Sequence, residues 1–408
     1  MKLRKFFGPS TLVAAAFIGP GTLTACTLAG ANYGYALLWA LVFAVVATIV
    51  FQEMAARLGL VSQQGLGEAI RSQLQHPAIK WSAVVLVIAA IGIGNAAYEA
   101  GNITGAVLGL EAMFGPLSVE WGRKINGWPL LLGVLALLLI WKGSFRLLER
   151  LLIGLVVLMG LLFLLTALLV GPDWGALFQG FVPGLQEAPW LGVVALVGTT
   201  VVPYNLFLHA AAIKEKYHRS EELGDLRIEN ATAILLGGFI SICIVITSAA
   251  AFHAKGMTVD NAAQMATQLE PLLGKGATIL LGLGLVAAGL SSAITAPLAA
   301  AYALQGVLGW KGKVQSVRFR SVGAIILLLG TLFSMLGYKP LELIQLAQVA
   351  NGLLLPVIAA FLWVMVNRTS LMGKYRNTLW QNVLAALVMG IVLLLTYRTA
   401  LLLWEKWM

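Results

Sequence analysis

Apolar runs long enough to cross a lipid bilayer follow one another along nearly the whole chain, with short polar segments between them. A membrane-spanning helix needs about 20 mainly apolar residues. By this criterion the sequence predicts eleven spans, at approximately 11–35, 36–57, 82–109, 128–142, 149–171, 189–213, 231–253, 276–308, 321–337, 343–366 and 379–402. No segment between them is long enough to bury a core of its own, so residues 1–408 are expected to form a single all-α membrane domain.

Two of these spans carry a proline near mid-depth that is flanked by groups able to line a cavity. The first span contains residues 17–23, read FIGPGTL, with Pro20 at its centre, and the sixth contains residues 201–205, read VVPYN, with Pro203. Proline and glycine weaken a helix, and they are tolerated in a membrane where the freed backbone groups face a cavity. A proline kink without any ligand role is the alternative interpretation of each.

The two prolines lie five spans apart, at matching positions of two five-span halves. Paired helix breaks of this kind are typical of transporters built from inverted repeats, which bind their substrate near the midplane. We therefore expect one repeat over residues 11–171, a second over 189–366, and an additional eleventh span at 379–402. Pro20 and Pro203 mark the predicted helix breaks.

Composition and charge agree with this interpretation. Hydrophobic residues make up 60% of the chain and charged residues 11%, a balance typical of membrane proteins. The net charge is +10, but 20 of the 27 Lys and Arg residues lie in segments on one side of the predicted membrane, so no nucleic-acid partner is expected. Because Lys and Arg gather on the cytoplasmic side, we expect a cytoplasmic N-terminus and an outside C-terminus. The expected location is the plasma membrane, in a bacterium the inner membrane, with lipid and no obligate protein as partners.

Ionisable residues inside a membrane are costly, so each is a candidate for function. Glu99 is the only acidic residue that we place in the body of a span, and Asn95 and Asn102 share its helix face. His209 lies one helical turn after Asn205 in the sixth span. Glu99, Asn102 and His209 therefore form a candidate proton pathway. A hydrogen-bonded structural glutamate and a histidine that ties helices together are the alternatives.

The candidate substrate site combines the two breaks with the tenth span, where Gln345, Gln348 and Asn351 form a polar stripe. Such a stripe could line a cavity or could bond to neighbouring helices. Residues 289–295, read GLSSAIT, are predicted to serve close helix packing. The candidate substrate-binding residues are Gly19, Gly21, Thr22, Thr199, Thr200, Val202, Tyr204, Asn205, Gln348 and Asn351.

The sequence argues against several other classes of protein. No cluster of Cys, His, Asp or Glu has metal-ligand spacing within the spans, and Cys26 and Cys243 lie in different spans, so no disulfide framework is predicted. There is no glycine-rich phosphate-binding loop with lysine, no soluble ATPase domain and no Ser-His-Asp arrangement. The chain is not expected to be an enzyme or to need a cofactor, which leaves gradient-driven transport.

Several stretches, in order and at matching spacing, resemble the Nramp (natural resistance-associated macrophage protein) family of divalent-metal transporters. GPGTLTACTLAGANYGYALLWALVFA and FQEMAARLGLVSQQGLGEAIR resemble its first two spans, and VGTTVVPYNLFLHAAA its sixth. GLSSAITAPLAAAYALQG resembles its eighth, and AQVANGLLLPVIAAFLW with LMGKYRN its tenth span and the following loop. The resemblance implies a LeuT-type fold and secondary active transport of metal ions, with protons as a candidate coupling ion in symport.

At the metal site this chain departs from the pattern that the resemblance implies. The family's first-span motif is Asp-Pro-Gly-Asn, and Gly19 and Thr22 stand at its Asp and Asn positions. Its sixth-span motif is Met-Pro-His, and Val202 and Tyr204 stand at its Met and His positions. Leu354 stands at the position of the family's tenth-span glutamine ligand. The chain therefore resembles an atypical member in which the usual metal-binding side chains are replaced, and no metal ligand is assigned.

Other family positions are kept in part. The family's acidic pair in the third span falls on Glu99 and Asn102, so one carboxylate has become an amide. Asn205 and His209 keep the family's residue types. These positions support a transporter more than they identify its substrate.

Three functions remain open for such a site. A hydrated divalent cation such as magnesium could be held through its water by backbone carbonyls and the side chains of Thr22, Thr199, Thr200, Tyr204 and Asn205. A small organic or anionic solute, such as an amino acid or carboxylate, could bind the N-terminal end of a half-helix at Gly19, Gly21 and Thr22. A non-transporting sensor or subunit is the third. The substitution Gly19→Asp would distinguish the cation from the anionic solute, because a carboxylate at this position favours binding of a cation and disfavours binding of an anion.

Overall fold

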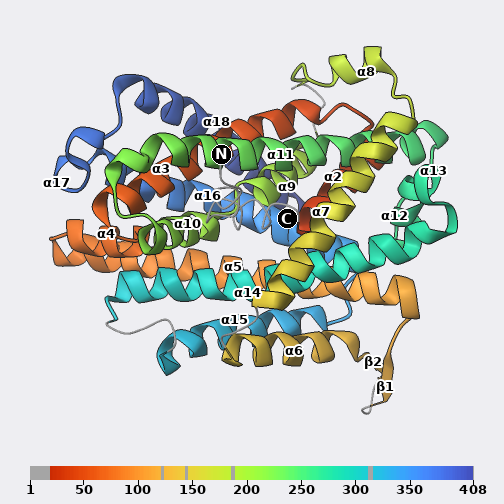
Figure 1. Ribbon diagram of the computed structural model, residues 1–408, viewed down its shortest axis with the longest axis horizontal. Coiled ribbons are helices and arrows are strands. Elements are labelled where there is room, and N and C mark those ends of the chain that lie inside the picture. The colour runs from red at the N-terminus through yellow and green to blue at the C-terminus, as the bar shows by residue number, and fades with distance from the viewer. Residues whose placement is uncertain (1–18, 121–123, 143–145, 185–188, 311–315, 408) are drawn as a thin grey trace.

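The computed structural model describes residues 19–120, 124–142, 146–184, 189–310 and 316–407, which are almost entirely helical (Figure 1). The long helices are α3 (Leu38–Ser62), α5 (Pro77–Phe114), α7 (Arg146–Leu169), α11 (Leu223–Ala251), α14 (Ala277–Leu308), α15 (Val317–Ser334), α16 (Pro340–Asn367) and α18 (Leu379–Trp407). Helices of intermediate length are α2 (Pro20–Tyr33), α6 (Trp128–Lys142), α9 (Trp190–Thr200) and α10 (Pro203–Lys216).

The long helices coincide with the predicted spans. Within the described ranges, nine helical segments are long and apolar enough to cross a membrane, with α9 and α10 counted as one, and they match the second, third and fifth to eleventh spans. The fourth predicted span corresponds to α6, whose apolar part, Trp128–Trp141, is shorter than those of the nine segments. Of the first span, α2 forms the second half, and residues 11–18 lie outside the described residues. The apolar pattern therefore located the membrane helices, with the largest end difference at the start of α11, which begins at Leu223.

Short elements connect the long helices, and the span pattern did not predict them. The helices among them are α4 (Leu66–Gln73), α8 (Trp174–Gln179), α12 (Ala262–Ala266), α13 (Glu270–Leu273) and α17 (Thr369–Met372). Single 3₁₀ turns lie at Ser220–Glu222, His253–Lys255, Thr267–Leu269, Gly274–Gly276 and Gly373–Tyr375. Strand β1 (Ser118–Glu120) pairs antiparallel with β2 (Lys124–Asn126), with Val119 opposite Ile125. Elements this short carry no clear hydrophobic period.

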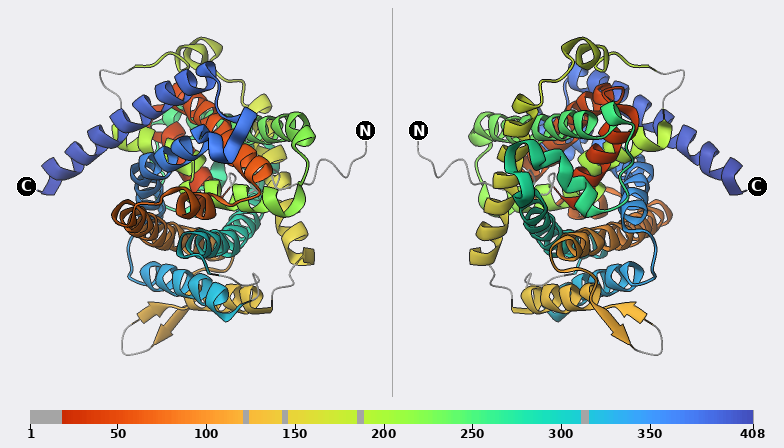
Figure 2. Two further views of the ribbon diagram at one scale, coloured as in Figure 1. Left: turned by 90° about the vertical axis from the view of Figure 1, so that its left-hand side faces the viewer. Right: turned by 90° about the vertical axis from the view of Figure 1, so that its right-hand side faces the viewer.

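The long helix α5 organises the packing. Helices α14, α15 and α16 all pack along α5, while α2 packs on α11 and α3 packs on α10 (Figure 1). Glycine allows close approach of these helices: a methyl group at Gly289 of α14 would lie 2.7 Å from the Asn102 carbonyl oxygen of α5. This contact agrees with the packing role predicted for residues 289–295. Figure 2 shows that the C-terminal part of α18 extends away from the bundle.

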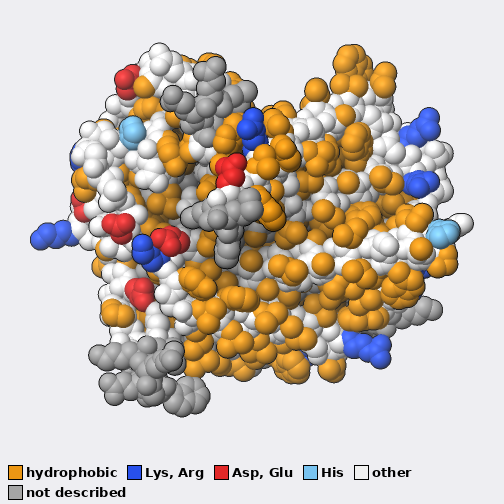
Figure 3. Space-filling view, turned by 180° about the vertical axis from the view of Figure 1, so that it is seen from behind, with side chains coloured by type: hydrophobic (Ala, Val, Ile, Leu, Met, Phe, Trp, Pro, Cys, Tyr) orange, Lys and Arg blue, Asp and Glu red, His pale blue; other side chains and the backbone are white. Residues whose placement is uncertain are grey.

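The outside of the bundle suits a lipid environment. On the face seen in Figure 3, hydrophobic side chains cover most of the middle, and charged side chains lie mainly toward the two ends. Large apolar side chains such as Leu168 and Trp380 are 70% and 81% exposed. Apolar surface on this scale would promote association in water, whereas a bilayer covers it. Cys26 and Cys243 are both buried and unpaired, as the sequence predicted.

Candidate functional site at two helix breaks

The sixth predicted span is interrupted where the sequence indicated. Helix α9 ends at Thr200 and α10 begins at Pro203, with Val201 and Val202 between them. Pro203 is the first residue of α10, where a missing N–H is tolerated because first-turn N–H groups have no partner within a helix. The last carbonyl groups of α9 and the first N–H groups of α10 therefore lie together, around the buried Val201 and Val202.

The first predicted break shows a helix start. Helix α2 begins at Pro20, and Gly19 is its N-cap residue with an extended backbone, φ −85° and ψ 174°. Gly19 has no side chain that could cap the helix, so α2 presents backbone N–H groups and the positive end of its dipole at this point. Pro20 packs against Gly105 of α5, where a larger side chain would clash. The glycine on α5 thus allows the start of α2 to approach the centre of the bundle.

The start of α2 and the break between α9 and α10 meet. Thr22 on α2 and Thr199 on α9 lie side by side, with their hydroxyl oxygens 2.8 Å apart although 177 residues separate them in sequence. Helix α16 joins them: the Gln348 side chain lies against Gly21, and the Gln348 backbone packs on Gly198. Thr199 and Gln348 are no more than 1% exposed. The structure therefore brings together candidate residues from the first, sixth and tenth spans, and their role in binding stays a prediction.

Several buried polar atoms on α10 and α16 have no hydrogen-bond partner among the described residues. They are both amide atoms of Asn205, Oε1 of Gln348 and Nδ2 of Asn351. Asn351 lies about one turn after Gln348 on α16, and Asn205 lies in the first turn of α10. Leaving such an atom unpartnered costs about 1–3 kcal/mol, so a polar molecule is expected beside it. The three side chains can offer both donors and acceptors to a bound solute.

The remaining candidate residues at the sixth-span break contribute in other ways. The Tyr204 ring is fully buried and packs edge-on against Tyr98 of α5, with 5.2 Å between the ring centroids. The Thr200 hydroxyl donates a 2.8 Å hydrogen bond to the Leu196 carbonyl within α9. Val202 is fully buried and has only backbone groups to offer a polar ligand.

The electrostatics at the breaks come from helix ends and neutral side chains. The N-terminal ends of α2 and α10 carry partial positive charge, and the C-terminal end of α9 carries partial negative charge. None of the ten candidate substrate residues is ionisable near neutral pH. Over the ranges that the structure describes, no group of three or more His, Cys, Asp or Glu side chains could hold a metal ion. Any cation here would be held by neutral oxygen atoms.

The candidate proton pathway begins on α5. The Asn102 side-chain amide donates a 3.1 Å hydrogen bond to Oε2 of the fully buried Glu99, whose Oε1 has no partner among the described residues. Helix α15 approaches closely here, because a methyl group at Gly330 would lie 2.5 Å from Glu99 Cγ. Asn95 instead ties two helices, since its Nδ2 donates a 3.0 Å hydrogen bond to the Ala296 carbonyl of α14.

His209 has a partner that the sequence analysis missed. Its Nδ1 lies 2.7 Å from Oε1 of Gln52 on α3, and both residues are fully buried. One turn earlier on α3, the Thr48 hydroxyl donates a 3.4 Å hydrogen bond to the Thr200 carbonyl at the end of α9. A polar residue inside the apolar second span was the only signal for Gln52. Glu99 and His209 lie on different helices and have separate partners.

A cavity of about 1260 Å³ lies away from the two breaks. The C-terminal ends of α2, α7 and α11 surround it, and Tyr35, Asp173 and His253 contribute to its lining. None of the candidate substrate residues belongs to this lining. The breaks themselves are closed to solvent, because their side chains are almost fully buried.

Leu354, at the position of the glutamine ligand that the resemblance implies, has an apolar environment. Its Cδ1 atom lies where Gly94 of α5 leaves room, 2.6 Å from the place that a methyl group on that glycine would take. The side chain of Gln348, nearly two turns earlier on α16, lies at the start of α2 instead. In this structure the amide from α16 that reaches the first break is therefore Gln348.

Comparison with known proteins places this geometry in a family. Residues 10–402 match the sequence model described as Nramp, natural resistance-associated macrophage protein-like. A "Divalent metal cation transporter MntH" of Verminephrobacter eiseniae is 31% identical, covering 96% of this chain and 88% of that protein. A protein of the same description from a Nostoc species is 30% identical over 95% of this chain and 88% of its own length.

Solved structures agree on the fold. A manganese transporter of Eremococcus coleocola superposes with a TM-score of 0.76 at 21% identity, covering 96% of this chain and 85% of that one. MhsT in complex with L-phenylalanine gives a TM-score of 0.60 at 18% identity, covering 95% and 98%. These likenesses confirm the expected all-α, LeuT-type membrane fold. Because the family model matches nearly the entire chain, this protein belongs to the Nramp-like family of membrane transporters.

Proposed function

We propose that this chain is a secondary active transporter that works by alternating access and binds its substrate where α2, α9, α10 and α16 meet. The observation that carries the proposal is the contact between Thr22 and Thr199 across the two breaks, with Gln348 beside it. Among the described residues, Oε1 of Gln348, both amide atoms of Asn205 on α10 and Nδ2 of Asn351 on α16 are buried without a hydrogen-bond partner. A transporter needs such a polar site inside the membrane, closed to solvent in at least one state.

The proposed substrate is a divalent cation. The relatives described above carry the name of divalent metal cation transporters, and they match this chain over nearly its whole length. The candidate residues offer hydroxyl, amide and carbonyl oxygen atoms but no carboxylate, thiolate or thioether. Transferring a bare divalent ion to such a site would replace strong hydration with neutral ligands. We therefore propose that the ion keeps part of its water, as Mg²⁺ does in many protein sites.

A second candidate substrate is a small anionic or zwitterionic organic solute. Two helix N-termini, those of α2 and α10, lie at the breaks, and a carboxylate is stabilised at such a position. The unpartnered atoms include amide N–H donors as well as oxygen acceptors, and donors suit an anion better than a cation. The absence of any acid among the candidate residues is compatible with this substrate.

We also propose that transport is coupled to protons. Glu99, hydrogen-bonded to Asn102, and His209, hydrogen-bonded to Gln52, are buried ionisable groups in the membrane-spanning part of the bundle. Such groups are found in proton relays of transporters. We also propose that the face with most of the Lys and Arg residues is cytoplasmic, which places the N-terminus inside and the C-terminus outside.

Uptake into proteoliposomes tests the substrate. We expect Mn²⁺ or Mg²⁺ to accumulate, and Asn205→Ala to reduce the uptake at least fivefold, because a ligand bond is worth about 1 kcal/mol or more. Asn261→Ala is the matched control: that side chain caps the short helix α12 in a loop. Accumulation of an amino acid or small carboxylate, without any metal uptake, would favour the second candidate.

A further inference from the structure

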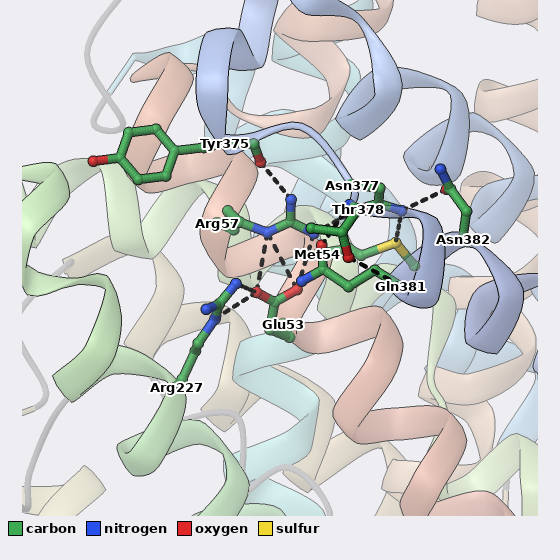
Figure 4. Close-up of polar contacts among 9 residues, drawn as sticks. All are labelled: Glu53, Met54, Arg57, Arg227, Tyr375, Asn377, Thr378, Gln381 and Asn382. Atoms are coloured by element: carbon green, nitrogen blue, oxygen red, sulfur yellow. Dashed lines mark hydrogen bonds and ion pairs between the residues drawn. The ribbon is translucent and has the colours of Figure 1, made fainter.

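Charged and polar side chains form a connected cluster (Figure 4). It lies at the end of the bundle to which the sequence assigns most of the Lys and Arg residues, called the basic end below. Glu53 and Arg57 come from α3, Arg227 comes from the start of α11, and Tyr375 and Asn377 come from the segment before α18. We call these five residues the α3 clamp. They belong to neither the substrate site nor the candidate proton pathway, so the proposed function leaves the clamp without a role.

Arg57 is the centre of the α3 clamp. Its side chain is only 1% exposed, and its Nε lies 3.0 Å from Glu53 Oε1. Nη1 donates a 2.6 Å hydrogen bond to the Tyr375 carbonyl, and Nη2 donates one of 2.6 Å to Asn377 Oδ1. A planar guanidinium can bind several partners at fixed angles, which a lysine cannot do. A buried charge is tolerated only with such partners, so Arg57 holds the segment before α18 firmly against α3.

The contacts continue from Asn377 into two further helices. Asn377 Nδ2 donates a 2.9 Å hydrogen bond to Oδ1 of Asn382 on α18. The same Asn382 oxygen accepts from Trp363 Nε1 of α16 at 2.8 Å, and Asn382 Nδ2 donates to Asn367 Oδ1 at 2.8 Å. The clamp therefore connects α3 to both α16 and α18. The predicted eleventh helix, an addition to the ten-helix repeat, is thereby tied to the core.

The other end of the same stretch of α3 contacts both halves of the broken sixth helix. Thr48 bonds to the last residue of α9, and Gln52, one turn later, bonds to His209 of α10. At the clamp end of this stretch, Gly59 of α3 lies directly against the Ala210 backbone of α10. Helix α3 therefore bridges the helix break through contacts with both α9 and α10. When α3 is displaced, α9 and α10 should move with it.

From these two sets of contacts we propose that the α3 clamp sets the balance between the two access states of the transporter. Closed, the clamp holds the basic end of α3, and with it the broken sixth helix, against α16 and α18. When the clamp is released, the basic end of α3 can separate from α16 and α18. The substrate site then opens toward the basic face. The proposal rests on the alternating-access part of the proposed function and is independent of the substrate. Arg57 is a positioning residue in this scheme and touches no substrate.

Cysteine labelling from each face tests the clamp. The reporter is Thr200→Cys at the sixth-span break, in a background with Cys26→Ala and Cys243→Ala. A membrane-impermeant maleimide is applied to vesicles of each orientation, and the ratio of the two labelling rates is measured. Arg227→Gln removes one ion pair from Glu53, and Arg227 is 44% exposed, so this variant should fold. Asn377→Ala removes the side-chain oxygen that accepts from Arg57 Nη2. Lys339→Gln, in the exposed pair with Glu342, is the matched control.

We expect labelling from the basic face to rise, relative to the other face, about tenfold for Asn377→Ala, because hydrogen bonds to a charged group are among the stronger ones. The effect of Arg227→Gln should be about threefold, in line with a partly exposed ion pair. The control should leave the ratio unchanged. An unchanged ratio in both clamp variants, or equal rises on both faces, would overturn the proposal. Because no substrate is added, failure of the substrate proposal would leave this result intact.

Discussion

Gly19→Asp probes the first helix break most sharply, because it places a carboxylate at the start of α2. The backbone at Gly19 is extended, with φ −85° and ψ 174°, so aspartate can adopt it without strain. Aspartate is a preferred N-cap residue, and exchanging glycine for it changes helix stability by only a few tenths of a kcal/mol. The fold should therefore tolerate the substitution, and its effect should appear in ligand binding.

The size of that effect follows from charge. Two unit charges about 4 Å apart attract by about 4 kcal/mol at an effective dielectric constant of about 20, and a divalent ion doubles this. Loss of water from the carboxylate offsets several kcal/mol. We expect a net gain of about 1–3 kcal/mol in cation binding, which corresponds to roughly tenfold to hundredfold tighter binding. The binding of an anionic ligand should be weakened by a comparable factor.

Isothermal titration of Gly19→Asp with Mn²⁺ and Mg²⁺ measures this gain. Gly19→Asn is the matched control, since it has the same shape and capping ability but no charge. If Gly19→Asp binds cations no better than Gly19→Asn, the break does not lie at the cation site, and the reasoning from the helix ends is wrong.

Three further predictions concern other contacts. Thr22→Val and Thr199→Val each remove one hydroxyl of the 2.8 Å pair, so each should lower uptake about fivefold and the double variant no further; independent, additive losses would show that the pair does not act together. Glu99→Gln replaces the buried carboxyl and should abolish the response of uptake to an imposed pH gradient, and an undiminished response would remove Glu99 from the proton pathway. Gly289→Leu forces a side chain against the Asn102 carbonyl and should destabilise the bundle by about 1–3 kcal/mol, seen as a lower melting temperature in detergent. Gly154→Leu, which has open space around it, is the control for this last variant, and equal melting of the two would contradict the packing.

Much of this fold follows from one-dimensional pattern, because a bilayer imposes a simple length rule on each span. Seven of the long helices are visible as apolar runs, namely α3, α5, α11, α14, α15, α16 and α18. The break before Pro203 is visible as a proline that is followed by Tyr204 and Asn205 inside an apolar span. The family resemblance added the LeuT-type arrangement. Short elements such as α4 and the β1–β2 hairpin were not predicted, because a few residues carry no periodic hydrophobic signal.

The contacts of the candidate site were harder to predict. The sequence indicated that Thr22, Thr199 and Gln348 could share a cavity, and the structure does bring them together. The partner of His209 was missed, because helical periodicity gives the face of a residue but not the residue opposite, and Gln52 lies 157 positions away. The α3 clamp was missed for the same reason: Arg57 and Asn377 are 320 positions apart. Only the packing of whole helices determines such pairs.

The central claim is that a divalent cation binds where the start of α2 meets the break between α9 and α10. Isothermal titration of the purified protein in detergent with Mn²⁺ and Mg²⁺ tests it most directly, alongside Asn205→Ala and the control Asn261→Ala. We predict saturable binding of at least one ion, weakened by Asn205→Ala and unchanged in the control. Binding of neither ion by a folded protein that does bind a small carboxylate would contradict the claim and assign the break to an anionic substrate.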